Sequence, residues 1–224
     1  MKLYLDTADT RLWQVPAGCP PIQGVTTNPT LVQQAGLPVT LASYRHLVSR
    51  AGEWRLPELM LQLPRADVAE AHDWIAELLP AAGQAQVRLT LKLPCHPDWA
   101  PVIREVRAWG LPVLLTGLAN PLQLLWAQAQ GAQFVAPYLG RLADDGRDVW
   151  TLVEACVTLQ KEGLNLLAAS IRSAEVFCRL IALGASAATV RPEFVVSLIH
   201  DPLTMAAMAE FDANVERSLL QPSV

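Results

Sequence analysis

The amino-acid sequence predicts a (β/α)8 TIM barrel with an additional C-terminal helix. Eight short apolar segments recur along the chain, and each is followed by a longer segment with helical spacing of its apolar residues. Several short segments, such as LTLKL and NLLAAS, are apolar on both faces, which is typical of parallel strands covered by helices. Because the 224 residues match the size of one such barrel, we expect a single domain over residues 1–224.

The predicted strands occupy residues 2–6, 24–27, 59–63, 89–93, 113–117, 134–138, 166–170 and 187–191. Segments such as VAEAHDWIAELL and PLQLLWAQAQG between them have helical periodicity. Gly110, Gly131 and Gly184 stand where helix C-caps should fall, and Pro101 and Pro121 stand near helix starts. A doubly wound open sheet is the alternative topology, but no GxGxxG or Walker motif follows any strand.

The final helix is expected near residues 202–220, beyond the eighth strand. Its apolar residues recur at helical spacing, at Met205, Met208, Phe211, Val215 and Leu219. Two interpretations of this apolar face remain open at this point. The helix packs on its own barrel, or it docks on a neighbouring subunit.

Composition excludes several classes of protein. The net charge of -4 and the pI near 5.6 argue against a nucleic-acid partner. The four cysteines form no CxxC pair and the four histidines no HExxH motif, which predicts buried free thiols and no metal site. The N-terminus lacks the pattern of a signal peptide, and no uninterrupted apolar run approaches 18 residues. We therefore expect a cytoplasmic protein without a membrane partner.

Active sites of such barrels lie at the C-terminal ends of the strands, so polar residues within or just after the predicted strands are the candidates. They are Asp6, Thr26, Thr27, Asn28, Gln62, Lys92, Thr116, Tyr138, Arg141, Ser170 and Arg172.

Lys92 is the most informative candidate, since it is one of only three lysines and lies inside the strand LTLKLP. Burial of an ammonium group is costly, so a buried lysine tends to lower its pKa. A neutral amine in an apolar pocket is the nucleophile that Schiff-base chemistry requires. The alternative is a structural lysine paired with a carboxylate such as Asp6. The other lysines, Lys2 and Lys161, have ordinary surface surroundings.

Each remaining candidate has a structural interpretation and a functional one. Asp6 either caps the following helix, a role that Thr7 or Asp9 can also fill, or faces Lys92 across the barrel mouth. Gln62 is either a satisfied core amide or a group that positions water.

Three further candidates point to an anion. Arg141, Ser170 and Arg172 lie at the ends of the sixth and seventh strands, where barrels often bind phosphate. The alternative for each arginine is a solvated surface charge, which is less expected for two arginines at adjacent strand ends.

Taken in order, the motifs LYLDTAD, GVTTNPT, LKLP, FVAPYLGRL and LLAASIRS resemble the small transaldolase / fructose-6-phosphate aldolase family over nearly the whole chain. The resemblance implies a class I aldolase that forms a Schiff base and needs no metal or organic cofactor. It also implies sugar-phosphate and dihydroxyacetone substrates. Finally, it implies a large homo-oligomer, a pentamer or decamer, with exchanged C-terminal helices.

The resemblance assigns catalytic roles residue by residue. Lys92 would attack the C2 carbonyl of a ketose such as fructose 6-phosphate. Gln62, Thr116 and Tyr138 would hold the water used in forming and hydrolysing the imine. Tyr138 would take the C4 hydroxyl proton, and Asp6 would position the amine. Gln62 and Tyr138 match the fructose-6-phosphate aldolase branch, since true transaldolases carry glutamate and phenylalanine there.

The resemblance also assigns binding roles. Asn28, with Thr26, would bind the dihydroxyacetone moiety. Arg141, Ser170 and Arg172 would hold the phosphate of glyceraldehyde 3-phosphate.

Three departures from the family pattern bear on the substrate, and one of them is the unusually acidic loop LADDGRD after the sixth strand. The loop after Lys92, residues 94–99, reads PCHPDW and is bulkier than usual, and Arg191 follows the eighth strand where the family tends to have an uncharged residue. Two alternatives to the aldolase remain. The shared scaffold also suits a transaldolase, which passes the three-carbon unit to a second aldose. The altered loop also suits a phosphosugar-binding barrel without turnover.

Overall fold

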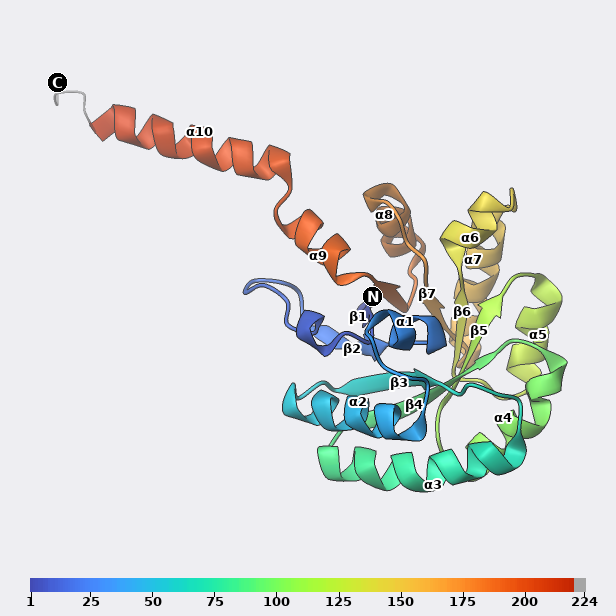
Figure 1. The fold of residues 1–224 in the computed structure, drawn as a ribbon. Coiled ribbons are helices and arrows are strands. Elements are labelled where there is room, and N and C mark those ends of the chain that lie inside the picture. Colours follow the sequence, from blue (N-terminus) through green and yellow to red (C-terminus); the bar gives the residue numbers. More distant parts are fainter. Residues whose placement is uncertain (220–224) are drawn as a thin grey trace.

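The computed structural model describes residues 1–219 and contains a closed barrel of eight parallel strands (Figure 1). Each strand pairs with the next one along the chain, and β1 pairs with β8. The strands are β1 (Lys2–Asp6), β2 (Ile22–Thr26), β3 (Glu58–Gln62), β4 (Arg88–Pro94), β5 (Val113–Leu118), β6 (Phe134–Pro137), β7 (Asn165–Ala168) and β8 (Ala187–Val190). The predicted fold is confirmed, and the open-sheet alternative is wrong because the β1–β8 pairing leaves no sheet edge.

Helices follow the strands around the outside of the barrel. The α-helices are α1 (Pro29–Gln34), α2 (Leu41–Glu53), α3 (Val68–Ala85), α4 (Ala100–Ala108), α5 (Pro121–Ala129), α6 (Leu139–Asp144), α7 (Val149–Leu159), α8 (Ala174–Leu183), α9 (Pro192–Ile199) and α10 (Pro202–Leu219). Short 3-10 helices are η1 (Thr10–Leu12), η2 (Pro97–Trp99) and η3 (Gln160–Glu162). Several begin at side-chain caps; Asp67, for example, accepts a hydrogen bond from the Glu70 backbone at the start of α3.

The barrel interior separates into an apolar layer and polar groups at each end. A buried apolar cluster from six strands fills the interior: Tyr4, Met60, Leu114, Phe134, Ala136, Leu167 and Ala187. At the N-terminal ends of the strands, the Glu58 carboxylate accepts hydrogen bonds from the Tyr4 hydroxyl (2.7 Å) and the Thr90 hydroxyl (2.6 Å). This buried network satisfies Glu58 and closes the end of the barrel opposite to the candidate site.

All four cysteines are free, but only Cys95 and Cys156 are buried. The prediction of four buried thiols is wrong for Cys178, which is exposed on α8, and for Cys19, which is half-buried. Helical periodicity alone does not show which side chain of α8 faces solvent, since α8 has apolar residues on both its faces: Leu180 is fully buried, whereas Ile181 is 53% exposed.

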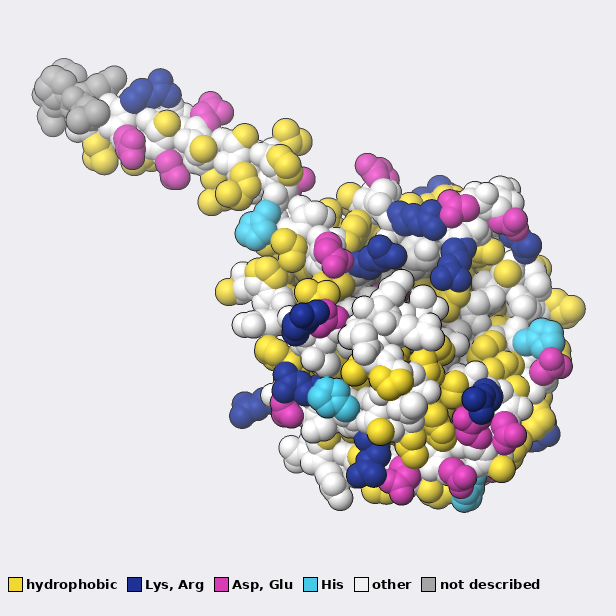
Figure 2. All heavy atoms as spheres, in the orientation of Figure 1, with side chains coloured by type: hydrophobic (Ala, Val, Ile, Leu, Met, Phe, Trp, Pro, Cys, Tyr) yellow, Lys and Arg dark blue, Asp and Glu magenta, His cyan; other side chains and the backbone are white. Residues whose placement is uncertain are grey.

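The C-terminal helix α10 extends away from the barrel (Figure 1). None of its residues between Pro202 and Leu219 is buried, and Figure 2 shows hydrophobic side chains along its length. Phe211 is 64% exposed and Leu203 is 82% exposed. The interpretation that this helix packs on its own barrel is therefore wrong, while docking on a neighbouring subunit stays a prediction. Residue 220, the predicted end of the helix, lies outside the described residues.

One helical stretch among the described residues is long and apolar enough to cross a membrane, judged by length and composition only. It runs over Pro192–Leu219, reaches a mean hydropathy of 1.2 and is almost entirely unburied. The stretch contains no uninterrupted apolar run of that length, because charged residues such as Glu210 and Asp212 interrupt α10. Length and hydropathy of this order also occur in helices of soluble proteins, so the stretch is weak support for a membrane partner.

Candidate active site

A cavity of about 760 Å³ opens at the C-terminal ends of the strands. Eight of the ten residues to which the resemblance assigns roles line it: Asp6, Asn28, Lys92, Thr116, Tyr138, Arg141, Ser170 and Arg172. The other two, Thr26 and Gln62, do not line it, and neither does the fully buried Thr27. The structure thus brings most of the predicted residues together around one space of the size of a small-molecule site.

Lys92 lies inside the barrel on β4, with only 3% of its surface exposed. Burial lowers the pKa of Lys92 below its usual range, and the negative charge of Asp6 acts in the opposite direction. Within the described residues no side chain accepts a hydrogen bond from the amine, which faces the cavity. These surroundings favour a neutral, unpaired amine over a structural ion pair.

Tyr138 and Thr116 form a hydroxyl pair on the β5–β6 side of the cavity. The Thr116 hydroxyl donates to the Tyr138 oxygen at 2.7 Å, which leaves the phenol proton free for another acceptor. Burial raises the pKa of Tyr138, and the Thr116 hydrogen bond and the Arg141 charge partly oppose this rise. The Arg141 guanidinium carbon lies 4.8 Å from the centre of the Tyr138 ring. A phenol of this kind is able to exchange a proton with a reacting hydroxyl.

Gln62 lies beside Lys92, since these residues are register partners on β3 and β4. Its backbone carbonyl accepts a hydrogen bond from the Tyr44 hydroxyl at 2.7 Å, which fixes this end of β3. Its side-chain oxygen is buried and has no partner among the described residues. An orphaned buried acceptor next to the amine supports a water-positioning group over a satisfied core amide.

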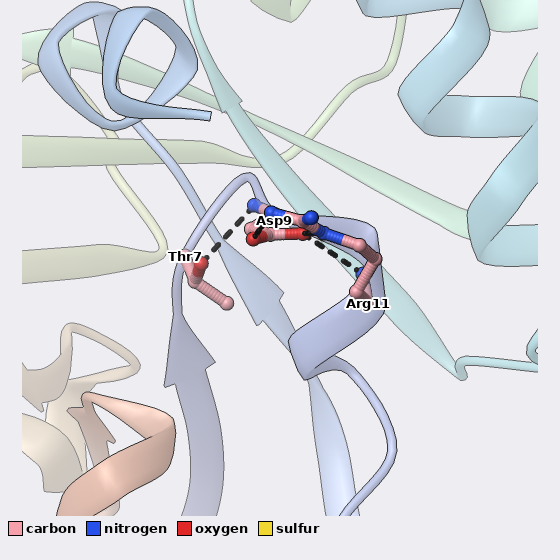
Figure 3. Close-up of polar contacts among 3 residues, drawn as sticks. All are labelled: Thr7, Asp9 and Arg11. Carbon is pink, nitrogen blue, oxygen red and sulfur yellow. Dashed lines mark hydrogen bonds and ion pairs between the residues drawn. The ribbon is translucent and has the colours of Figure 1, made fainter. Parts of the chain in front are cut away.

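Asp6 is not needed as a cap, because Thr7 and Asp9 fill that role (Figure 3). The Thr7 hydroxyl oxygen accepts from the Asp9 backbone at 3.1 Å, and the Asp9 carboxylate accepts from the Arg11 backbone at 3.0 Å and pairs with its guanidinium. The Asp6 carboxylate accepts instead from the Thr26 hydroxyl at 2.7 Å. Asp6 therefore keeps a free side toward the cavity.

Asn28 and Thr26 differ in what they present to the cavity. The Asn28 side-chain oxygen accepts from the Leu31 backbone at the start of α1, so its amide protons stay available. The Thr26 side chain is fully buried, and its proton is committed to Asp6. The structure therefore places the Asn28 amide where it can contact a molecule bound in the cavity, whereas Thr26 lies behind Asp6.

The side of the cavity that contains Ser170 and Arg172 depends on a close approach between α6 and the end of β7. Gly140 donates its backbone N–H to the Ser170 carbonyl at 3.0 Å, and Ser170 has a left-handed φ of 59°. A Cβ on Gly140 would lie 2.6 Å from the Arg172 Nε and 2.7 Å from the Ser170 carbonyl oxygen. Arg172 also pairs with Asp144 at 2.8 Å. Glycine at position 140 thus allows the serine and arginine to sit against the helix start.

We expect Gly140→Ala to displace Ser170 and Arg172 and to raise the KM for a phosphorylated substrate roughly tenfold, with a stability loss of about 1–3 kcal/mol. Steady-state kinetics and urea unfolding measure the two effects. Gly83→Ala is the matched control, because nothing lies within 4 Å of a Cβ there and α3 should gain slightly in stability. An unchanged KM in Gly140→Ala would show that this contact does not affect binding of the phosphorylated substrate.

Several polar residues that line the cavity have no role assigned from the sequence, among them Thr189 and Arg191. Thr189 lines the cavity from β8 and is 2% exposed, and Arg191 lines it just after β8. A hydroxyl inside the apolar strand AATV was the available signal for Thr189. For Arg191, the signal in the sequence is a charged residue where the family tends to have an uncharged one.

The unusual loop after Lys92 lies away from the cavity, since none of residues 94–99 is among the described residues that line it. The Cys95 backbone N–H donates to the Thr116 carbonyl at 2.8 Å, and the Gln123 amide donates to the Cys95 carbonyl at 2.9 Å. The loop is therefore tied to the next strand and helix, and its bulk does not reduce the space at Lys92.

Comparison with known proteins agrees with this geometry. Residues 59–221 match the family Transaldolase/Fructose-6-phosphate aldolase. Proteins named probable transaldolase are similar along the whole chain: that of Desulfatibacillum aliphaticivorans is 28% identical over 97% of this chain and 99% of its own, and that of Roseobacter denitrificans is 29% identical over 97% and 98%. That of Syntrophobacter fumaroxidans is 29% identical over 98% and 95%. The chain belongs to the transaldolase/fructose-6-phosphate aldolase family and is an enzyme of the aldolase and transaldolase class.

Proposed function

We propose that this enzyme is a Schiff-base aldolase that reversibly cleaves fructose 6-phosphate to dihydroxyacetone and glyceraldehyde 3-phosphate. The observation that carries the proposal is the buried amine of Lys92 in one cavity with the hydrogen-bonded phenol of Tyr138. A neutral amine supplies the nucleophile, and a phenol within the same cavity supplies the acid–base group that carbon–carbon cleavage requires.

The proposed reaction begins with attack of the Lys92 nitrogen on C2 and loss of water to give an iminium ion. Tyr138 then takes the C4 hydroxyl proton and passes its own phenol proton to the water held beside Gln62. The C3–C4 bond breaks in the same step, and its electron pair moves into the iminium to form an enamine. Glyceraldehyde 3-phosphate leaves. Protonation of the enamine at C3 and hydrolysis release dihydroxyacetone and the amine. Gln62, with Thr116 and Tyr138, holds the water for the imine steps, which its orphaned buried oxygen supports.

The remaining assignments concern binding. Asn28 would contact the dihydroxyacetone moiety with its free amide protons. Asp6 would hold the Lys92 amine and the hydroxyls of the dihydroxyacetone moiety. Arg141, Ser170 and Arg172 would hold the phosphate. In support, the two arginines come from adjacent strand ends and line the same cavity as Lys92.

A transaldolase is the second candidate, because the similar proteins above are named probable transaldolases. Such an enzyme passes the dihydroxyacetone unit from a ketose phosphate to a second aldose phosphate. Assays of both reactions on one preparation separate the candidates. Free dihydroxyacetone from fructose 6-phosphate alone is the result expected of the aldolase; dominant transfer to erythrose 4-phosphate, with little free dihydroxyacetone, contradicts it.

Trapping of the imine tests the chemistry that both candidates share. Borohydride reduction in the presence of dihydroxyacetone should add one three-carbon unit to the peptide that contains Lys92, as measured by peptide mass analysis. A protein without an adduct on Lys92 would be a phosphosugar-binding barrel without turnover, and both enzyme mechanisms above would be wrong.

We also place the enzyme in the cytoplasm as a homo-oligomer in which α10 docks on a second copy. The exposed apolar side chains of α10 support this assembly, because so long an apolar face is unfavourable in water.

Deletion of residues 202–224 is expected to lower the molar mass from that of a pentamer or decamer to that of smaller species, as measured by light scattering on a sizing column. Because α10 makes no buried contact with its own barrel, the far-ultraviolet signal of the remaining barrel should persist. A full-length chain that runs as a monomer would contradict the proposed docking.

A further inference from the structure

A chain of buried hydroxyl groups joins β8 to Asp6. The Thr189 and Thr26 hydroxyl oxygens lie 2.6 Å apart, and the Thr26 oxygen lies 2.7 Å from an Asp6 carboxylate oxygen. Thr26 is fully buried, and Thr189 is 2% exposed. Thr26 and Asp6 are register partners on β2 and β1, while Thr189 pairs with Tyr4 on the other side of β1. This row of hydrogen-bonded hydroxyls therefore crosses the inner face of β1, where the barrel closes between β8 and β1.

The direction of donation along this chain follows from the number of protons. An ionised carboxylate only accepts, so the contact between Thr26 and Asp6 uses the single hydroxyl proton of Thr26. The contact between Thr26 and Thr189 must then use the proton of Thr189. Donation runs from Thr189 to Thr26 to Asp6, and the incoming bond fixes the rotamer of the Thr26 hydroxyl and strengthens its outgoing bond.

We propose that Thr189 is a positioning residue of the reaction, which acts through Thr26 to hold the Asp6 carboxylate in place opposite Lys92. The inference rests on the proposed Schiff-base function. A carboxylate on the last residue of β1 is otherwise held by a single hydroxyl among the described side chains. Small displacements of a group next to reacting atoms have large effects on rate. The Thr189 hydroxyl therefore affects the rate by fixing Asp6, although it does not itself contact the amine.

The charge of Asp6 reaches several ionisable groups around the cavity. It opposes the effect of burial on the pKa of Lys92 and adds to the rise in the pKa of Tyr138. Arg191 and Glu193 line the same space, while Asp9 nearby is paired with Arg11. Loss of a fixed Asp6 should therefore lower the pKa of Lys92 and move the acid limb of the pH–rate profile to lower pH.

The test compares Thr189→Val, which keeps the branched shape and removes the hydroxyl, with Thr189→Ser, which keeps the hydroxyl. We expect Thr189→Val to lower kcat roughly tenfold with little change in KM, and to shift the acid limb of the kcat/KM profile, which reports the free enzyme, downward in pH. Thr189→Ser should restore most of the rate and the wild-type limb. Equal impairment in both variants, or an unchanged kcat and profile in Thr189→Val, would overturn the proposal.

A double-mutant cycle separates positioning from direct substrate contact. If Thr189 acts only through Thr26, the double variant with Thr26→Val should be no slower than Thr26→Val alone. Multiplied losses, or a KM increase confined to Thr189→Val, would mean that Thr189 contacts substrate itself and would overturn the proposal. Borohydride trapping of the wild type is run in parallel: an absent adduct refutes the Schiff-base function, whereas an adduct with unaffected Thr189 variants refutes the positioning role alone.

Discussion

Replacement of Lys92 by methionine is expected to abolish turnover and, at the same time, to raise the stability of the fold at neutral pH. The amine is the proposed nucleophile, and removal of a nucleophile typically costs roughly 10⁴-fold or more in rate. Methionine fills a similar volume, and the apolar side chains of Ala136 and Leu167 line the same cavity as position 92. Activity and stability should thus change in opposite directions.

The pH dependence of the stability gain follows from the sign of the pKa shift. Burial lowers the pKa of Lys92 in the folded protein relative to the unfolded chain, so the unfolded chain binds more protons between the two values. The buried lysine lowers the free energy of unfolding by its full amount below the pKa of the folded state. This loss of stability disappears as the pH rises toward the pKa of the unfolded chain, about 10.4. A pKa lowered by one unit corresponds to about 1.4 kcal/mol in the free energy of unfolding. The advantage of Lys92→Met in urea unfolding should therefore be large at pH 7 and small at pH 10.

Lys161→Met is the matched control, because Lys161 is exposed on η3. It should leave both the rate and the free energy of unfolding close to wild type at both pH values. Substantial activity in Lys92→Met would remove Lys92 from the mechanism. A Lys92→Met protein less stable than wild type at pH 7 would mean that the buried amine is paired and structural.

The barrel could be predicted from the sequence because its cause is local. Strands apolar on both faces, alternating with amphipathic segments, leave few arrangements other than a parallel sheet covered by helices. The positions of Lys92 and Gln62 followed from the same pattern, since a polar residue inside such a strand must face either the core or the mouth of the barrel. The resemblance then supplied roles that periodicity alone does not contain.

The features that escaped prediction depend on contacts between distant segments. The hydroxyl chain from Thr189 to Asp6 exists only because β8 closes against β1, and residues 163 positions apart meet there. The sequence likewise grouped Thr26 with Asn28, although one is buried behind Asp6 and the other lines the cavity. The spacing of apolar residues on α10 indicates a helix but not the surface that the helix meets.

Tyr138→Phe is expected to suppress release of free dihydroxyacetone while leaving the Lys92 imine intact. The ring stays beneath Arg141, but the phenol oxygen that accepts the Thr116 hydrogen bond is lost. Loss of a general acid–base group typically costs 10²–10⁴-fold, so we expect cleavage of fructose 6-phosphate to fall by about that factor. Transfer to erythrose 4-phosphate should gain relative to cleavage, because phenylalanine is the residue that true transaldolases carry in the resemblance above.

Tyr4→Phe is the matched control for the same chemical change at the opposite end of the barrel. Its hydroxyl donates to Glu58, so this variant should lose stability while its folded fraction keeps the wild-type ratio of transfer to cleavage. Borohydride trapping on Tyr138→Phe checks that the amine still reacts. If the imine forms and the ratio of transfer to cleavage is unchanged, Tyr138 is not the proton carrier. The proton must then pass through another cavity group, and the preference for the aldolase over the transaldolase loses its chemical basis.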